Sequence, residues 1–169
     1  MIKAPFHLQA WIDDNRDKLK PPVGNAEVFP GSDYIVMVVG GPNNRSDFHI
    51  NQGPEFFFQL EGQMNLRVIE GGIPKDIPIA EGEVFVLPAN VPHSPQRFAH
   101  SVGLVVEQVR GPEEKDGFLW ICEKCHTELY KEFVHVTDIV AQLPIVFDHF
   151  YQNPEHTTCK SCGEIATRS

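Results

Sequence analysis

Between about residues 26 and 110 the chain consists of short apolar runs rich in β-branched and aromatic residues. Gly, Pro and Asn separate one run from the next. Short runs at such intervals, with no helical period between them, predict an antiparallel sandwich or barrel. The fold class is therefore expected to be mainly β. The predicted strands are Tyr34–Val39, Glu55–Leu60, Met64–Ile69, Val84–Leu87 and Val102–Val109.

Two segments outside this region have a helical period. From about residue 6 to 19 the apolar side chains follow a spacing near 3.6, which predicts one short amphipathic helix that ends before Pro21. A second apolar stripe covers residues 136–151, where Thr137 or Asp138 is a candidate cap. Pro144 lies inside this stripe, so we expect a kink or a division into two helices.

The composition limits the classes of partner. The 169 residues carry a net charge of −9 with only 14 Lys and Arg, which disfavours nucleic acid and anionic membrane surfaces as partners. No apolar run is long enough to span a membrane. The N-terminal residues lack the apolar core of a signal peptide, so a cytoplasmic protein with reduced thiols is expected.

All four cysteines lie in the last third of the chain, as two Cys-X-X-Cys pairs. In a reducing compartment such pairs predict one four-thiolate site for Fe or Zn. Two disulfides, a haem attachment at the Cys-X-X-Cys-His sequence, and a nucleic-acid zinc ribbon are the alternatives. The missing export signal and the acidic balance disfavour the last two. The predicted ligands are Cys122, Cys125, Cys159 and Cys162.

A polar stretch, Gly111–Asp116, separates these cysteines from the strand-rich region. We therefore expect a catalytic domain with an N-terminal helix in residues 1–111. Residues 112–169 are expected to form a small helical appendage around the four-cysteine metal site.

A second metal site is predicted from His49, Glu55 and His93, which lie on segments that we interpret as strands. Alternate residues of a strand share a face, and the inward faces of neighbouring barrel strands converge. Two imidazoles and one carboxylate can hold Fe(II) from one side and leave adjacent positions for a chelating substrate and O₂. The same ligands can hold Mn, Ni or Zn. The alternative is that both histidines are structural.

Two motifs carry a resemblance to the cupin superfamily. His49–Glu55 followed by Gly62 resembles the first cupin motif, and Gly82 to His93 with Pro88 and Asn90 resembles the second. The resemblance implies a jelly-roll-like double-stranded β-barrel, and a homodimer because cupins commonly pair through sheet edges. Asn51 stands where many cupins have a second histidine, so His49 is the expected ligand and Asn51 a bystander. Arg97 stands where many have asparagine.

Further segments match one family within this superfamily: Lys20–Asn25, Val39–Asn43, Arg45–His49, Pro54–Gln59, Val91–Arg97 and Val106–Glu107. Through them the whole chain resembles the 3-hydroxyanthranilate 3,4-dioxygenase family, in its bacterial and fungal type with a C-terminal cysteine cluster. The resemblance implies a non-haem Fe(II) enzyme with extradiol-type ring cleavage. Its substrates would be 3-hydroxyanthranilate and O₂, and its product 2-amino-3-carboxymuconate semialdehyde. That product leads to quinolinate and NAD in the kynurenine branch of tryptophan catabolism.

The remaining polar residues fit an aromatic acid as substrate. Arg45 and Arg97, each four residues from a ligand histidine, are expected to grip its carboxylate. Glu107 lies in an apolar strand and is the candidate catalytic residue, which could accept the phenolic proton or bind the polar groups of the substrate. The alternative is a structural ion pair with an arginine. The family resemblance implies that Asn25 lies near O₂ or the substrate, and the alternative is a plain turn residue.

Competing interpretations concern the substrate and turnover. A related cupin dioxygenase could act on another aromatic ring or on a small thiol, and a metal-binding cupin could lack turnover altogether. The histidines expected to be structural or on the surface are His7, His100, His126, His135, His149 and His156.

Overall fold

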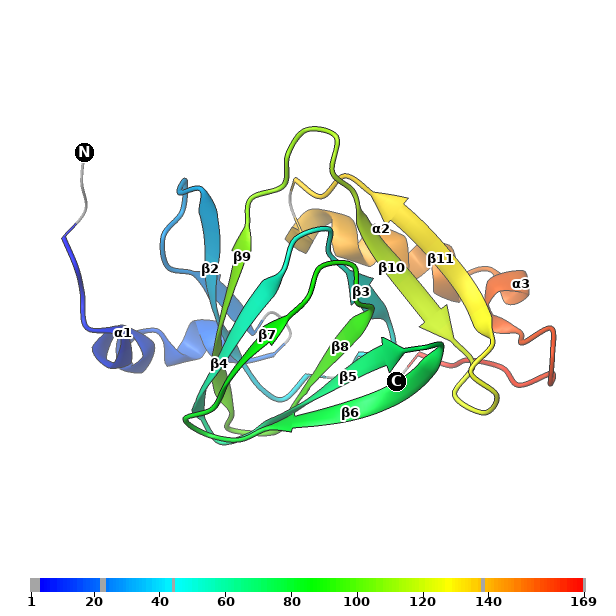
Figure 1. Cartoon of the computed structure of the whole chain (residues 1–169), viewed down its shortest axis with the longest axis horizontal. Coiled ribbons are helices and arrows are strands. Elements are labelled where there is room, and N and C mark those ends of the chain that lie inside the picture. The colour runs from blue at the N-terminus through cyan, green and yellow to red at the C-terminus, as the bar shows by residue number, and fades with distance from the viewer. Residues whose placement is uncertain (1–3, 22–23, 44, 138, 169) are drawn as a thin grey trace.

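The structure is a computed structural model that describes residues 4–21, 24–43, 45–137 and 139–168. Two antiparallel sheets face each other and enclose a barrel (Figure 1). The first sheet has the order β1-β2-β9-β4-β7 and the second β11-β10-β3-β8-β5-β6. The strands are β1 (Asn25–Glu27), β2 (Tyr34–Gly40), β3 (Phe48–Ile50), β4 (Glu55–Glu61), β5 (Met64–Glu70), β6 (Ile73–Ile79), β7 (Val84–Leu87), β8 (His93–Arg97), β9 (Val102–Gln108), β10 (Asp116–Ile121) and β11 (Glu128–Val134).

The prediction of a mainly β cupin barrel is confirmed, and all five predicted strands are present as β2, β4, β5, β7 and β9. Four strands lacked a prediction: β1, β6, β10 and β11. β6 contains Pro74 and Pro78 and lies at a sheet edge, which is where proline is tolerated in a sheet. Asp116, assigned to a linker from sequence, is the first residue of the fully buried strand β10.

The N-terminal helix is shorter than predicted, because it is divided at Asn15. Helix α1 (Leu8–Asp14) ends there, and a 3-10 turn, η1 (Arg16–Leu19), follows. The Asn15 side chain donates a hydrogen bond to the Trp11 carbonyl, 2.8 Å away, and competes with continued helix. Ile12 and Leu19 from these two elements bury against Val38 and Val102 of the first sheet.

The C-terminal helix α2 (Ile139–Tyr151) runs through Pro144 as one helix. Of the two predicted outcomes, the division into two helices is wrong and the kink stays a prediction. Proline at this sixth helical position removes a single hydrogen bond, that to the carbonyl of residue 140. The candidate cap Asp138 lies outside the described residues. α3 (Pro154–Thr157) follows, and Asn153 caps it by accepting from the backbone N–H of Glu155.

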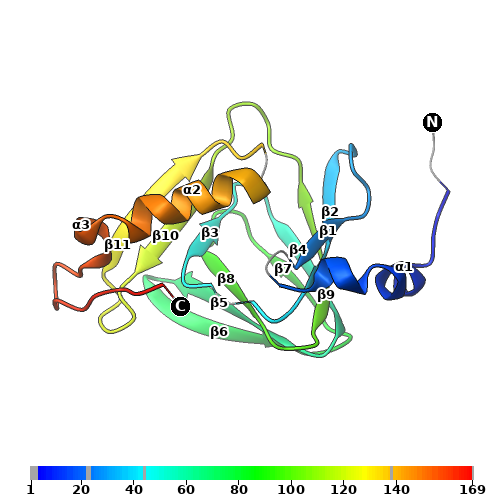
Figure 2. The ribbon, with the colours of Figure 1, turned by 180° about the vertical axis from the view of Figure 1, so that it is seen from behind.

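The apolar core has two main parts. The barrel interior is filled from facing strands by residues such as Phe57, Leu66 and Val105. A second cluster packs α2 against the hairpin β10–β11, where the rings of Trp120 and Phe150 stack with centroids 4.6 Å apart. Figure 2 shows α2 lying across the outer side of this hairpin.

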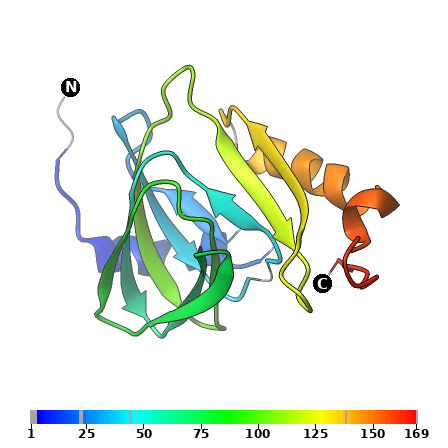
Figure 3. The same cartoon turned by 45° about the vertical axis from the view of Figure 1, so that its right-hand side comes forward.

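The hairpin is continuous with the barrel, since β10 pairs with β3 through Gly117↔Ile50, Phe118↔His49 and Leu119↔Phe48. Figure 3 shows β10–β11 with α2 and α3 on one side of the barrel and α1 on the other. The predicted division at residues 111/112 stays a prediction, but the later segment reaches into the sheet that carries His49. Among the described residues, no helix has the length and apolar character needed to cross a membrane.

Candidate active site and four-cysteine cluster

Three ligand-type side chains converge inside the barrel. His49 in β3 lies directly opposite His93 in β8, and Glu55 begins β4 in the facing sheet. Glu55 Oε1 lies 3.5 Å from His49 Nδ1, and Glu55 Oε2 lies 3.3 Å from His93 Nε2. All three residues are buried, and their candidate ligand atoms lie within 4.8 Å of one another. The structure thus brings together the three side chains that the spacing singled out.

The charges of these groups are coupled. Burial opposes ionisation of Glu55, but the two imidazoles, chiefly the charge of His93, hold its pKa well below its ordinary value. Burial also opposes a charged His49, but hydrogen bonds and charge from Asp116 and Glu55 raise its pKa to about 9. The site is therefore an anionic cage that attracts a cation, either protons or a metal.

Each imidazole turns one nitrogen toward Glu55 and the other toward a fixed partner. His93 Nδ1 lies 3.0 Å from the Val91 carbonyl, so Nδ1 donates and Nε2 is free for a metal. His49 Nε2 lies 2.8 Å from Asp116 Oδ2. The pKa of Asp116 is lowered, since its bonds to His49 and Arg110 outweigh burial, so this carboxylate accepts and Nε2 is the donor. Two imidazole nitrogens and one carboxylate oxygen, preset in this way, fit a divalent first-row metal.

Asn51 is part of the site, so its description as a bystander is wrong. Its side-chain amide donates to Glu55 Oε1 at 3.1 Å and to Glu107 Oε2 at 2.8 Å. An amide with two donor hydrogens can hold two carboxylates that would otherwise repel each other. Asn51 therefore fixes the distance between the candidate ligand Glu55 and the candidate catalytic residue Glu107.

Glu107 in β9 lies opposite Glu55 in β4 and is buried. Burial and the charge of Glu55 raise its pKa, and Arg110 opposes that rise. Arg110 Nη2 lies 2.9 Å from Glu107 Oε2, so the ion pair considered from sequence exists, with Arg110 as the partner. The pair does not exclude a role toward substrate, because a raised pKa suits a proton acceptor.

Arg110 and Asp116 were missed as site residues in the sequence. The available signal was a charged residue directly next to an apolar run: Arg110 follows β9, and Asp116 opens β10. Arg110 Nε and Nη2 contact the two Asp116 oxygens at 3.0 and 2.8 Å, a bidentate ion pair.

The two arginines expected to grip a carboxylate have different surroundings. Arg45 precedes β3 and pairs with buried Asp47, with Nε and Oδ1 3.0 Å apart, and the charge of Glu55 further raises its pKa. Arg97 ends β8 with 4% of its surface exposed, and burial lowers its pKa to about 10. Its Nη1 finds no hydrogen-bond partner among the described residues. A buried guanidinium without an anion is costly, so Arg97 is ready to receive one.

Gly103 makes room for Arg97. A Cβ at this position would come within 2.5 Å of Arg97 Nη1. The register places Gly103 opposite Gln59 and Val39, four residues along β9 from Glu107. Asn25 pairs with Val39 from β1 and so lies at the level of Gly103 rather than at the level of Glu107. The structure thus brings the triad and Glu107 together, and places Arg97 and Asn25 further along the sheet.

The four cysteines form a second cluster. Cys122 Sγ lies 3.6 Å from Cys162 Sγ, and Cys125 Sγ lies 3.5 Å from Cys159 Sγ. Sulfurs of a disulfide are about 2.05 Å apart, so these are free thiols. Around a tetrahedral ion at about 2.3 Å, sulfurs lie about 3.8 Å apart, which is close to the observed spacing.

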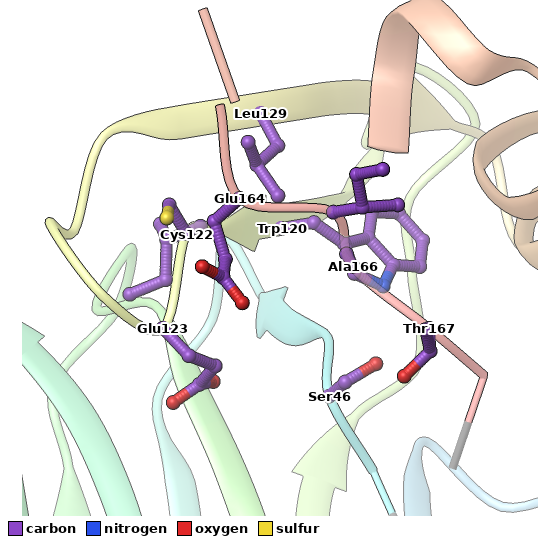
Figure 4. A pocket seen from close by; sticks show the side chains of 10 residues that line it. Ser46, Trp120, Cys122, Glu123, Leu129, Glu164, Ala166 and Thr167 are labelled. Atoms are coloured by element: carbon purple, nitrogen blue, oxygen red, sulfur yellow. The ribbon is translucent and has the colours of Figure 1, made fainter. Parts of the chain in front are cut away.

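Both Cys-X-X-Cys loops are closed in the same way. The backbone N–H of His126 donates to the Cys122 carbonyl, and that of Gly163 donates to the Cys159 carbonyl. Both donors have a positive φ, 60° at His126 and 75° at Gly163. His126 thus serves the loop through its backbone. Figure 4 shows a cavity beside this cluster, lined by Cys122, Glu164 and Ser46 among others, and none of the three triad residues lines it.

The fold and the buried triad define a metal-binding cupin. Residues 1–151 match the family described as 3-hydroxyanthranilic acid dioxygenase. The chain is 49% identical over 165 residues to the 3-hydroxyanthranilate 3,4-dioxygenase of Xanthomonas oryzae pv. oryzae. The alignment covers 98% of this chain and 93% of that relative. It is 43% identical over 166 residues to the Neurospora crassa enzyme of the same name, with coverages of 98% and 92%. The chain belongs to the 3-hydroxyanthranilate 3,4-dioxygenase family and is an enzyme.

Among solved structures, a cupin-2 domain protein from Shewanella frigidimarina is similar with a TM-score of 0.47 and 17% identity. The match covers 62% of this chain and all of that one.

Proposed function

We propose that this enzyme uses Fe(II), held by His49, Glu55 and His93, to open the ring of 3-hydroxyanthranilate between C3 and C4 with O₂. The product would be 2-amino-3-carboxymuconate semialdehyde. The observation that carries the proposal is the buried triad, in a chain that shares nearly its whole length with dioxygenases of that name. Both atoms of one O₂ enter the product, so no outside reductant is needed.

The triad suits this chemistry because it supplies only three ligands, which can hold the ion from one side. A metal held this way keeps adjacent positions for the hydroxyl and amino groups of the substrate and for O₂. When bound, Fe(II) supplies the redox chemistry that joins O₂ to the ring, and the protein supplies geometry and charge.

The substrate carboxylate would pair with Arg97. Its buried Nη1 has no partner among the described residues, and a carboxylate is the planar anion that a guanidinium holds best. Arg45, already paired with Asp47, adds a second positive charge at the site. Asn25, at the level of Gly103, would lie toward the same end of the substrate or near O₂.

Glu107 would accept the phenolic proton. Asn51 and Arg110 fix its carboxylate next to Glu55, and its raised pKa brings its proton affinity toward that of a phenol. Loss of that proton makes the ring more electron-rich, which favours reaction with O₂. In this assignment Glu107 moves a proton and Glu55 holds the metal, although the two residues are neighbours across β4 and β9.

The proposal is tested by O₂ uptake of the anaerobically iron-loaded protein with 3-hydroxyanthranilate. We expect one O₂ consumed per ring opened, and no uptake by Glu55→Ala, which should also lose iron from the triad. 2-Aminophenol, which lacks the carboxylate, should react with a much higher KM. Uptake with a small thiol or a different ring, and none with 3-hydroxyanthranilate, would assign another cupin dioxygenase activity.

Further parts of the proposal extend beyond the site. The four-cysteine cluster would hold Fe or Zn for stability, since four thiolates leave no open position. We also propose a homodimer in the cytoplasm, acting in the kynurenine branch of tryptophan catabolism. Sedimentation of the purified protein tests the homodimer.

A further inference from the structure

Arg110 and Asp116 lie between His49 and Glu107, outside the space that the three candidate ligands face. One Asp116 oxygen, Oδ2, lies 2.8 Å from both His49 Nε2 and Arg110 Nη2. The same Arg110 nitrogen lies 2.9 Å from Glu107 Oε2. Asn51 then continues the connection from Glu107 to Glu55. The side chains in this chain of contacts are nine-tenths or more buried, so water screens the charges only weakly.

We propose that Arg110 and Asp116 are positioning residues of the active site. Asp116 fixes the His49 ring so that Nδ1 faces the metal, and Arg110 holds Asp116 and Glu107 in a single arrangement. The part that concerns His49 and the metal is independent of the substrate. The part that concerns Glu107 rests on the proposed function.

The His49 ring has one freedom that packing does not remove. The Phe118 ring stacks on it with centroids 5.5 Å apart and fixes the plane of the imidazole. A half-turn of the ring keeps that plane but exchanges the nitrogen and carbon edges. The flipped ring would turn carbon atoms toward Asp116 and Glu55. The hydrogen bond from Nε2 to Asp116, at 2.8 Å the shorter of the two contacts, therefore favours the orientation in which Nδ1 lies 3.5 Å from Glu55. Asp116 therefore decides which nitrogen is offered to the metal.

Arg110 allows two buried carboxylates to stay in this arrangement. Asp116 and Glu107 both contact Arg110 Nη2, and the guanidinium places a positive charge between them. Without it, like charges would face each other in a site of low dielectric, and one carboxylate would move away. A lysine has no planar fork and cannot contact both Asp116 oxygens while reaching Glu107.

Direct evidence comes from ¹⁵N NMR of histidine-labelled, zinc-loaded wild-type protein, because this measurement needs no variant. We expect His49 to carry its proton on Nε2 and the metal on Nδ1. A metal on Nε2, with the proton on Nδ1, would overturn the proposal.

Metal affinity gives a second readout that does not involve turnover. Co²⁺ bound to thiolates and Co²⁺ bound to nitrogen and oxygen absorb differently, so the two sites can be titrated separately in the full-length protein. Asp116→Asn should weaken Co²⁺ binding at the triad about 10- to 100-fold and leave the thiolate site unchanged. The matched control is Asp76→Asn, an exposed aspartate near Arg67, which should change neither affinity. A triad affinity of Asp116→Asn within twofold of wild type would contradict the assignment.

Arg110→Lys tests the link to Glu107. We expect a drop in kcat for 3-hydroxyanthranilate that exceeds the change in KM, together with a shifted pH profile. Arg67→Lys, which keeps a surface charge near Glu123, is the control. Wild-type kinetics in Arg110→Lys would remove Arg110 from the proposal. If neither wild type nor variant turns over 3-hydroxyanthranilate, the proposed function fails, while the NMR and Co²⁺ results still decide the role of Asp116.

Discussion

Replacing Arg97 with methionine should make the substrate-free protein more stable and weaken its binding of the substrate. The guanidinium is 4% exposed, and burial lowers its pKa from 12.5 to about 10. A depressed pKa in a base means that the charged form is destabilised by folding at every pH below about 10. A shift of this size corresponds to at most about 3 kcal/mol, at about 1.4 kcal/mol per pH unit. Methionine keeps much of the volume and removes the buried charge.

The expected free energy of unfolding of Arg97→Met is therefore about 1–3 kcal/mol higher, measured by urea denaturation without substrate. The same variant should raise the KM for 3-hydroxyanthranilate about 10- to 100-fold, because a charged hydrogen bond contributes about 1.5–3 kcal/mol. Arg67→Met, which loses ion pairs with Asp76 and Glu123 and a cation–π contact with Phe48, should change neither quantity strongly. A less stable Arg97→Met with an unchanged KM would show that the guanidinium is structural and would refute this reasoning.

Three further predictions concern Gly103, Cys122 and His49. Gly103→Ala should displace Arg97 Nη1 and so weaken its contact with the substrate carboxylate. A loss of about 1.4 kcal/mol in that contact would raise the KM about tenfold, which steady-state kinetics would measure. Cys122→Ser should keep much of the activity but unfold at a lower temperature, measured by calorimetry; full iron at the triad with no activity would contradict this. In the metal-free protein the raised pKa of His49 stabilises the fold fully below pH 6.5, and that contribution is lost as the pH rises through about 9. Urea titrations should show a decrease of at most about 3 kcal/mol over this range, and metal-loaded protein should not show the decrease.

The strand pattern was readable where strands are half-buried and separated by glycine, as in β4 and β5. It failed for strands that lack this pattern. β10 is buried on both faces and carries no alternation, and the edge strand β6 contains two prolines. The helix break at Asn15 was also missed, because a single side chain bonded to the Trp11 carbonyl outweighs the apolar period.

The three candidate metal ligands could be singled out because each lies in a short motif whose residue spacing can be recognised in the sequence. The sequence marks Arg110 and Asp116 only as charged residues beside apolar runs. Their role could not be predicted, because it depends on β10 returning to pair with β3, which brings Asp116 to His49 across 67 residues. For the same reason Asn51 was assigned no role, although its amide lies between two carboxylates from different strands. Arg97 was singled out, but its lack of a partner appears only when the side chains around it are placed.

The central claim is that one metal held by His49, Glu55 and His93 meets the substrate inside the barrel. Anomalous X-ray scattering from crystals soaked anaerobically with Fe(II) and 3-hydroxyanthranilate tests it most directly. We predict iron at about 2.0–2.2 Å from the three ligands, with the substrate ring against the iron and its carboxylate toward Arg97. Iron found only at the four cysteines, or substrate bound away from the triad, would contradict the account.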